Sequence, residues 1–240
     1  ISFCRGRINM DKELRQKLKD QALICGLWGS FIGSGVPILE SLDALADEFR
    51  TYNPKFSHVK NSVATGRTIA SALNDYDKNI KPTRFTPEFN PLIAVGEKTG
   101  SLDILFKRME RLYDLGAQNV FDGNQANLFN RYSLYSQLAY IIDSGLLLSE
   151  ALDITFATTK VLPQNVLTEL VANVSQNKTL EESMKIFSGY FSKTEVALIG
   201  AGESEEISAL IGARKSEGAL SRNLDRLADH YAKHLEYSNL

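Results

Sequence analysis

Residues 31–43 read FIGSGVPILESLD, and residues 141–153 read IIDSGLLLSEALD. Six positions are identical at an offset of 110 residues: Ile32, Ser34, Gly35, Glu40, Leu42 and Asp43 recur as Ile142, Ser144, Gly145, Glu150, Leu152 and Asp153. A segment that returns with this fidelity predicts a repeated structural unit.

Three further blocks recur in the same order downstream. TIASAL at 68–73 is echoed by TLEESM at 179–184, LIAVGE at 92–97 by LIGAGE at 198–203, and TGSLDILFKRMERLY at 99–113 by EGALSRNLDRLADHY at 217–231. Four ordered blocks indicate a duplication with domains at 1–118 and 126–240. The polar stretch Asp122–Gln125 is the expected joint. The changing offset predicts a longer connection around 79–87 and about a dozen extra residues between Glu203 and Glu217.

Apolar residues within each unit follow the period of a helix, and no run alternates as a strand would. One apolar stripe runs through residues 37–50 and includes Leu42; Leu152 is its counterpart in the second unit, so both are expected in the core. We therefore predict an all-α fold of two tandem, homologous helical bundles with about six helices each. Gly35 and Gly145 are expected at equivalent helix corners, and so are Gly96 and Gly202.

Composition excludes several classes of function. The formal net charge of −2 gives no electrostatic footprint for nucleic acid. Cys4 and Cys25 lie without a metal-binding partner motif, which favours free thiols in a reducing compartment. No segment reaches the roughly 18 consecutive apolar residues that a membrane span needs.

Two motifs suggest ligands only superficially. The segment Gly96–Gly100 contains Lys98-Thr99, but a phosphate-binding loop needs a glycine directly before the lysine and a preceding strand. His230 and His234 lie four residues apart on a predicted helix, yet no third ligand accompanies them, which favours surface histidines. We predict no metal, no cofactor and no catalytic residues, because no nucleophile or acid–base constellation stands out.

Glu97 and Glu203 are the candidate site residues, because each follows a glycine at the same place in its repeat. One hypothesis is a structural carboxylate at a helix corner that accepts backbone hydrogen bonds. The alternatives are a contact with a partner protein or one ligand of a hard cation. A lone carboxylate is a poor ion site, which favours the structural hypothesis.

The repeated blocks resemble the type II secretion F protein family, the inner-membrane platform shared with type IV pilus assembly. The resemblance is carried by Ser34–Leu42, Gly66–Leu73 and Leu92–Leu102. The second unit keeps Ser144-Gly145 and 198–203. After these residues its sequence departs from the family pattern, because the Gly-x-Leu element appears only at 218–220. The position of the last helix corner in the second unit is therefore not predicted.

The resemblance implies a non-enzymatic scaffold at the cytoplasmic face of the bacterial inner membrane. Its implied partners are the hexameric assembly ATPase, inner-membrane assembly proteins and pilins, with a possible homo-oligomer. Family members similar to this chain carry membrane spans, expected near 117–130 and after Leu240; here they would have been removed or be naturally absent.

Two other classes of function stay open. One is a soluble helical adaptor built on the same duplicated bundle, which the presence of membrane spans in the full-length gene would exclude. The other is an enzyme that uses the cleft between the two domains. It would need converging titratable groups with shifted pKa values, and the sequence shows no such cluster.

Overall fold

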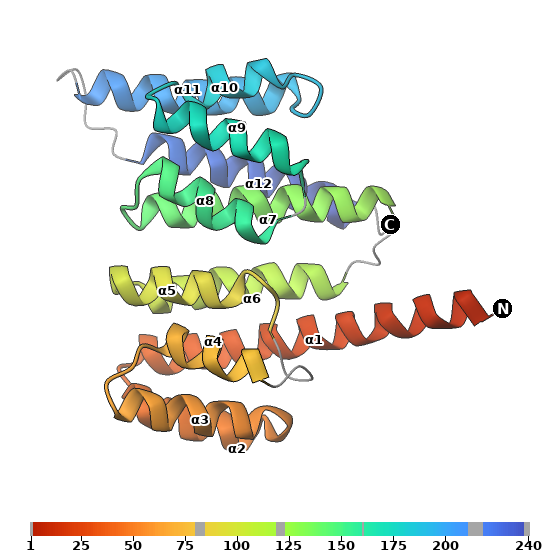
Figure 1. Ribbon diagram of the computed structural model, residues 1–240, viewed down its shortest axis with the longest axis vertical. Coiled ribbons are helices and arrows are strands. Elements are labelled where there is room, and N and C mark those ends of the chain that lie inside the picture. The colour runs from red at the N-terminus through yellow and green to blue at the C-terminus, as the bar shows by residue number, and fades with distance from the viewer. Residues whose placement is uncertain (1, 80–84, 119–122, 160, 211–217, 238–240) are drawn as a thin grey trace. The chain divides into compact units, whose positions relative to one another are not determined.

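The computed structural model describes residues 2–79, 85–118, 123–159, 161–210 and 218–237 (Figure 1). Within these ranges every regular element is a helix and no strand occurs, which confirms the all-α prediction. Contacts divide the chain into two compact units, Ile1–Val120 and Phe121–Leu240, called unit 1 and unit 2 below. The finer domain boundaries at 118 and 126 stay a prediction.

Unit 1 is a bundle whose first and last helices pack along each other. Its helices are α1 (Ser2–Gly33), α2 (Ile38–Glu48), η1 (Arg50–Tyr52), α3 (Asn53–Ala64), α4 (Ile69–Asn79), α5 (Phe89–Thr99) and α6 (Leu102–Gln118). The fully buried Trp28 of α1 stacks on Phe106 of α6, with 4.7 Å between ring centroids. Gly29 permits this approach, because a Cβ there would lie 2.9 Å from the Cβ of Phe106. From α2 to α6 each α-helix packs on the next.

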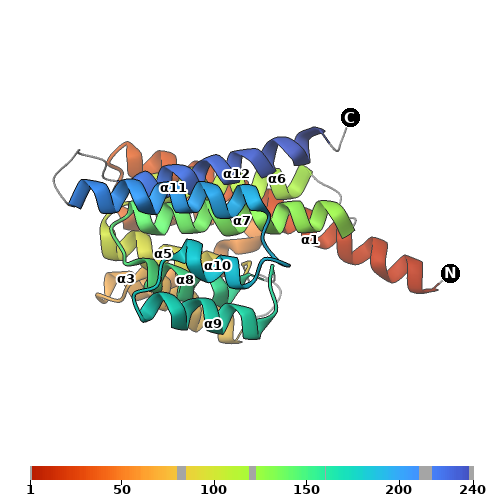
Figure 2. The same ribbon diagram turned by 90° about the horizontal axis from the view of Figure 1, so that it is seen from above.

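Unit 2 shows the same order of neighbouring helices. It contains α7 (Gly123–Asp143), α8 (Leu148–Thr158), α9 (Gln164–Ser175), α10 (Leu180–Ile186), α11 (Lys193–Leu210) and α12 (Ala219–Tyr237). Here α12 lies along both α7 and α11 (Figure 2). The equivalent cores include Leu42 in unit 1 and Leu152 in unit 2, both with 0% exposure. The origin of the two units by duplication stays a prediction, although their helix order agrees.

The first corner of each unit is a left-handed glycine turn, as the sequence predicts. Gly35 has φ +78° and Gly145 has φ +89°, conformations that a side chain disfavours. In unit 1 the Val36 N–H donates to the carbonyl oxygen of Phe31 at 2.9 Å. The corresponding donor in unit 2 is Leu146, which reaches Ile141 at 3.3 Å. These bonds satisfy carbonyls that the helix end would otherwise leave unpaired.

The expectation that Gly96 and Gly202 form corners is wrong, because both lie inside helices, in α5 and α11. Their role is close packing: a Cβ on Gly96 would lie 2.8 Å from Leu102 Cδ2, and one on Gly202 would lie 2.8 Å from the Cα of Leu220. The residues with positive φ before α6 and α12 are Gly100 and Gly218.

Two predicted loops also differ from the structure. Gly123–Gln125 of the expected joint form the first turn of α7. The extra residues after Glu203 extend α11 to Leu210, so that much of the insertion is helical. The rest of these two segments, at residues 119–122 and 211–217, lies outside the described residues, and so does the middle of the connection predicted around 79–87, at residues 80–84. No helix in the described ranges is both long enough and apolar enough to cross a membrane.

Candidate functional site

Glu97 binds the start of a neighbouring helix in unit 1. Its Oε1 accepts the backbone N–H of Ile69 at 2.6 Å, and its Oε2 accepts that of Ala70 at 2.9 Å. These two residues begin α4, whose first N–H groups have no partner within the helix. A carboxylate is well suited to this place, since the helix N-terminus carries partial positive charge. The glutamate therefore ties the end of α5 to the start of α4.

Glu203 makes the same arrangement in unit 2. Its Oε1 accepts the N–H of Leu180 at 2.6 Å, and its Oε2 accepts that of Glu181 at 2.9 Å. The helix it binds, α10, also has a capping box between Thr179 and Glu182. Glu203 lies well inside α11 rather than at a helix end, because that helix continues for two further turns. We call each of these two-bond contacts a carboxylate clamp.

The clamp of unit 2 lies in a more acidic surrounding. Burial raises the pKa of Glu203, and the nearby carboxylates of Glu181 and Glu206 raise it further, whereas the two backbone hydrogen bonds lower it. Glu206 itself accepts the N–H of Leu220 at 3.0 Å, at the start of α12. Two carboxylates one turn apart on α11 thus bind the starts of two different helices.

The role of Glu97 can be measured with a substitution that keeps its size. We expect Glu97→Gln to lower the free energy of unfolding by about 1–2 kcal/mol, because the amide keeps one acceptor but turns an N–H donor toward a backbone N–H. Urea unfolding of the full chain measures the change. Glu40→Gln, at an exposed position on α2, is the control and should stay within about 0.5 kcal/mol. Equal stability of both variants would contradict a structural clamp.

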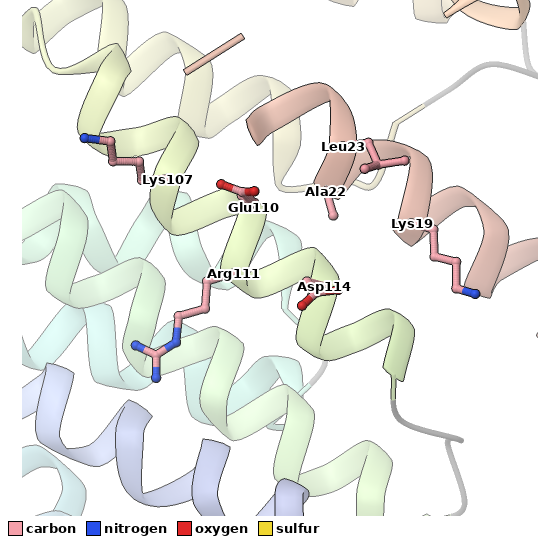
Figure 3. Close-up of a pocket in the computed structure, with 7 residues that line it drawn as sticks. All are labelled: Lys19, Ala22, Leu23, Lys107, Glu110, Arg111 and Asp114. Atoms are coloured by element: carbon pink, nitrogen blue, oxygen red, sulfur yellow. The ribbon is translucent and has the colours of Figure 1, made fainter. Parts of the chain in front are cut away.

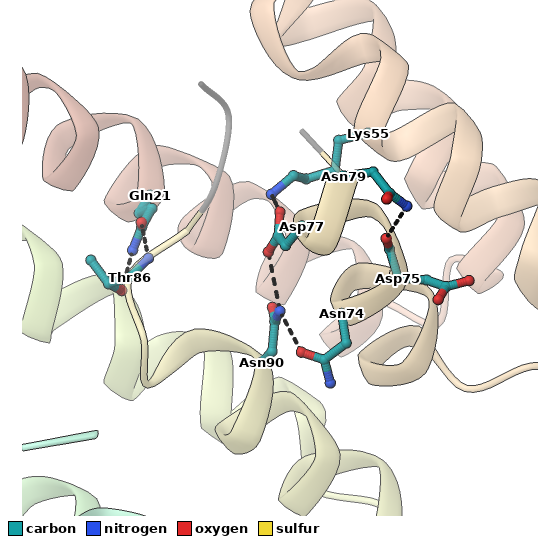
Figure 4. A network of polar contacts seen from close by, with 8 residues as sticks. All are labelled: Gln21, Lys55, Asn74, Asp75, Asp77, Asn79, Thr86 and Asn90. Carbon is teal, nitrogen blue, oxygen red and sulfur yellow. Dashed lines mark hydrogen bonds and ion pairs between the residues drawn. The ribbon is translucent and has the colours of Figure 1, made fainter. Parts of the chain in front are cut away.

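A second polar contact in each unit fixes the loop that precedes α5 or α11. In unit 1 the Gln21 amide bonds to Thr86 twice, since its Nε2 donates to Oγ1 and its Oε1 accepts the backbone N–H, each at 2.9 Å (Figure 4). In unit 2 the place of Gln21 is taken by Arg131, whose Nη1 lies 2.8 Å from Glu195 Oε1. Sequence patterns did not identify these contacts across the bundle.

Glu195, in the first turn of α11, makes several polar contacts in unit 2. It is 2% exposed, its Oε1 also accepts the Tyr135 hydroxyl at 2.5 Å, and its Oε2 accepts the N–H of Ser192 at 2.6 Å. Burial and the adjacent Glu195 carboxylate raise the pKa of Tyr135 well above its usual range. The Ser192-x-x-Glu195 pattern of a capping box was present in the sequence and could have marked this helix start.

A buried ion pair lies inside unit 1. Lys55 Nζ lies 2.6 Å from Asp77 Oδ1, and the two side chains are 0% and 8% exposed. The second oxygen of Asp77 accepts the Asn90 amide at 3.1 Å, and that amide also donates to Asn74 (Figure 4). The Lys55 ammonium lies 3.8 Å from the ring centroid of Phe85. Such a pair is a rigid element of the core that tolerates no loss of one partner.

Cys25 and the two histidines near the C-terminus are the other residues that the sequence singled out for their chemistry. Burial raises the pKa of the Cys25 thiol well above its usual range, with Glu110 and Glu88 adding to the effect, which disfavours the nucleophilic thiolate. His230 and His234 are exposed and lie edge to face, with 4.5 Å between ring centroids. Among the residues that the structure describes, no three His, Cys, Asp or Glu side chains gather where they could hold a metal ion.

Comparison with known families gives a match within unit 1. Residues 24–119 match the family model of the type II secretion system (T2SS), protein F. This segment runs from the middle of α1 to the residue after α6, and it contains Glu97 with its partners at the start of α4. The clamp of unit 1 is thus part of the segment that carries the family likeness.

Curated relatives give the same result. The chain is 34% identical over 89 residues to the type IV pilus assembly protein PilC of Myxococcus xanthus, which covers 36% of this chain and 20% of the relative. It is 30% identical over 95 residues to PilC of Pseudomonas aeruginosa, covering 39% and 24%. The type II secretion system protein F of Vibrio cholerae is 32% identical over 94 residues, covering 38% and 21%. The matches span only a fifth to a quarter of these relatives.

Proposed function

Because the chain belongs to the type II secretion system protein F and type IV pilus platform family, we propose that it is a non-enzymatic scaffold for pilus or pseudopilus assembly. In this proposal the two units lie at the cytoplasmic face of the bacterial inner membrane. They bind the hexameric assembly ATPase and contact inner-membrane assembly proteins and pilins. The observation that carries the proposal is the family match over residues 24–119.

The internal polar contacts of unit 1 support a scaffold. A protein that transmits force between partners needs helices that keep their relative positions under load. The clamp of Glu97 joins α5 to α4, and the buried pair of Lys55 with Asp77 joins α3 to α4. Both oxygens of Glu97 and both oxygens of Asp77 accept hydrogen bonds within unit 1, which favours a role in rigidity.

Binding of the assembly ATPase from the same organism tests the proposal. We expect the purified full chain to form a complex with the purified hexamer in biolayer interferometry, with a dissociation constant of about micromolar or lower. An unrelated hexameric ATPase is the control and should not bind. Glu97→Gln should bind like the unmodified chain, because we propose that its carboxylate serves the fold. Absence of a complex with the unmodified chain would contradict the proposed partner.

A further inference from the structure

His230 and His234 form a pair of exposed imidazoles on α12 of unit 2. Residues four apart on an α-helix project from the same face on successive turns. The two rings lie edge to face, with 4.5 Å between their centroids and 63° between their planes. Their exposure agrees with the sequence interpretation of surface histidines, and the short distance between the rings adds an observation that the spacing alone did not provide.

The distance between the rings is that of two imidazoles that share one metal ion. Histidine nitrogens bind zinc at about 2.0–2.1 Å. With such bonds the ring centroids lie about 4.5 Å apart for an angle of about 90° at the metal, and about 5.2 Å apart for a tetrahedral angle of about 109°. The observed separation agrees with the smaller angle. Because both side chains are exposed, rotation about their side-chain bonds can direct one nitrogen of each ring toward a common ion without a change in the helix.

The fold does not use the two imidazoles. Within the described residues neither ring makes a hydrogen bond or an ion pair, and their ring contacts are with each other and, for His230, with Tyr231. The alignment of the repeats places Leu112 and Gly116 of unit 1 at the two positions. The bundle of unit 1 thus forms without such a pair, which leaves the imidazoles of unit 2 available for a ligand.

The donor atoms, rather than the local charge, indicate the class of ligand. The neighbouring exposed side chains of α12 have both signs, as Lys233 and Glu236 show. Imidazole nitrogen prefers borderline transition metals such as Zn²⁺, Cu²⁺ and Ni²⁺, whereas Ca²⁺ and Mg²⁺ require oxygen ligands. Two imidazoles on one helix face therefore favour a transition-metal ion.

A groove of about 610 Å³ between α1 and α6 of unit 1 does not offer such donors (Figure 3). Lys19 and Lys107 line it together with Glu110 and Asp114, and its described lining residues include neither histidine nor cysteine. The mixed charges of this groove favour no class of ligand, whereas coordination chemistry supports the histidine pair.

We infer that His230 and His234 form a binding site for a borderline divalent transition-metal ion such as Zn²⁺ or Cu²⁺. Each imidazole supplies one nitrogen. No third His, Cys, Asp or Glu side chain of the described residues joins the pair, so the remaining coordination positions of the ion are open to water or to groups of another molecule. The inference goes beyond the proposed function and does not depend on it.

Titration of the full chain with metal chlorides tests the site. We expect isothermal titration calorimetry to show a Zn²⁺ site with a dissociation constant of about 1–100 µM, and tighter binding of Cu²⁺. Ca²⁺ and Mg²⁺ should not bind at this site. His230→Gln and His234→Gln should each weaken Zn²⁺ binding at least about tenfold, because a single imidazole cannot chelate the ion. The electron paramagnetic resonance spectrum of bound Cu²⁺ should show two nitrogen ligands in the unmodified chain and fewer in each variant.

A variant with a displaced histidine is the matched control. His234→Gln combined with Glu236→His keeps three histidines in the chain but places the second imidazole on another face of the helix, so it should bind Zn²⁺ as weakly as His234→Gln alone. Circular dichroism should show the same helical content for all variants, because the substituted side chains are exposed.

Three results would overturn the inference. The first is equal Zn²⁺ binding by the unmodified chain and by His234→Gln, which would place the ion elsewhere. The second is the absence of both Zn²⁺ and Cu²⁺ binding at about 1 mM. The third is full binding by the displaced-histidine variant, which would show that the number of histidines matters and their spacing does not.

Discussion

We expect Asp77→Ala to lower the free energy of unfolding by about 3–5 kcal/mol. The substitution leaves the Lys55 ammonium, which has 0% exposure, without its carboxylate partner at 2.6 Å. The aromatic ring of Phe85 offers only weak compensation, since cation–π contacts contribute about 0.5–2 kcal/mol. The amide of Asn90 also loses one of its two acceptors. The loss of the carboxylate partner of a buried charge is among the few causes of so large an effect.

Two control variants make this test specific. Asp75→Ala removes a carboxylate two residues away that pairs with Arg67 at the surface, and we expect no comparable loss. Lys55→Met combined with Asp77→Leu replaces the whole pair by apolar groups and should recover most of the lost stability. Urea unfolding of the full chain gives all three values. If Asp77→Ala unfolds at the same urea concentration as Asp75→Ala, the buried pair contributes little.

The fold could be predicted from the sequence because its signals are local and repeated. The spacing of apolar residues gives the helices, and the turn glycines Gly35 and Gly145 give two corners. The glycines at 96 and 202 misled the prediction, because a glycine near the end of an apolar run is typical of a corner. Close packing against Leu102 or Leu220 also requires a residue without a side chain. Only the folded structure distinguishes a closely packed glycine from a glycine at a corner.

The polar contacts were accessible only in part. Glu97 and Glu203 were found because the repeated sequence blocks contain both of them, and they are the acceptors in both clamps. Lys55 and Asp77 are 22 residues apart on different helices, with no repeated counterpart and no spacing typical of an ion pair. Their meeting depends on how α3 and α4 pack, which no local pattern encodes.

The second large loss of stability is expected from substitution of the core leucines in the first repeated block, Leu42 and Leu152. Leu42→Ala and Leu152→Ala should each lower the free energy of unfolding by about 2–5 kcal/mol. Both side chains have 0% exposure, in α2 and in α8. Each substitution removes apolar atoms and leaves a cavity that the surrounding helices fill only partly. Leu147→Ala is the control, since that leucine is 70% exposed, and it should change stability by less than about 0.5 kcal/mol.

The double variant tests whether the two leucines act independently. Leu42 and Leu152 belong to different compact units, so their effects should add to within about 0.5 kcal/mol if no residue contacts both. Calorimetry of the single variants provides a second measurement, because we expect each substitution to lower the stability of its own unit most. A loss below about half a kcal/mol for either leucine would show that it does not lie in a close-packed core. Large and additive losses would instead support equivalent core positions, the physical basis for treating residues 31–43 and 141–153 as one repeated segment.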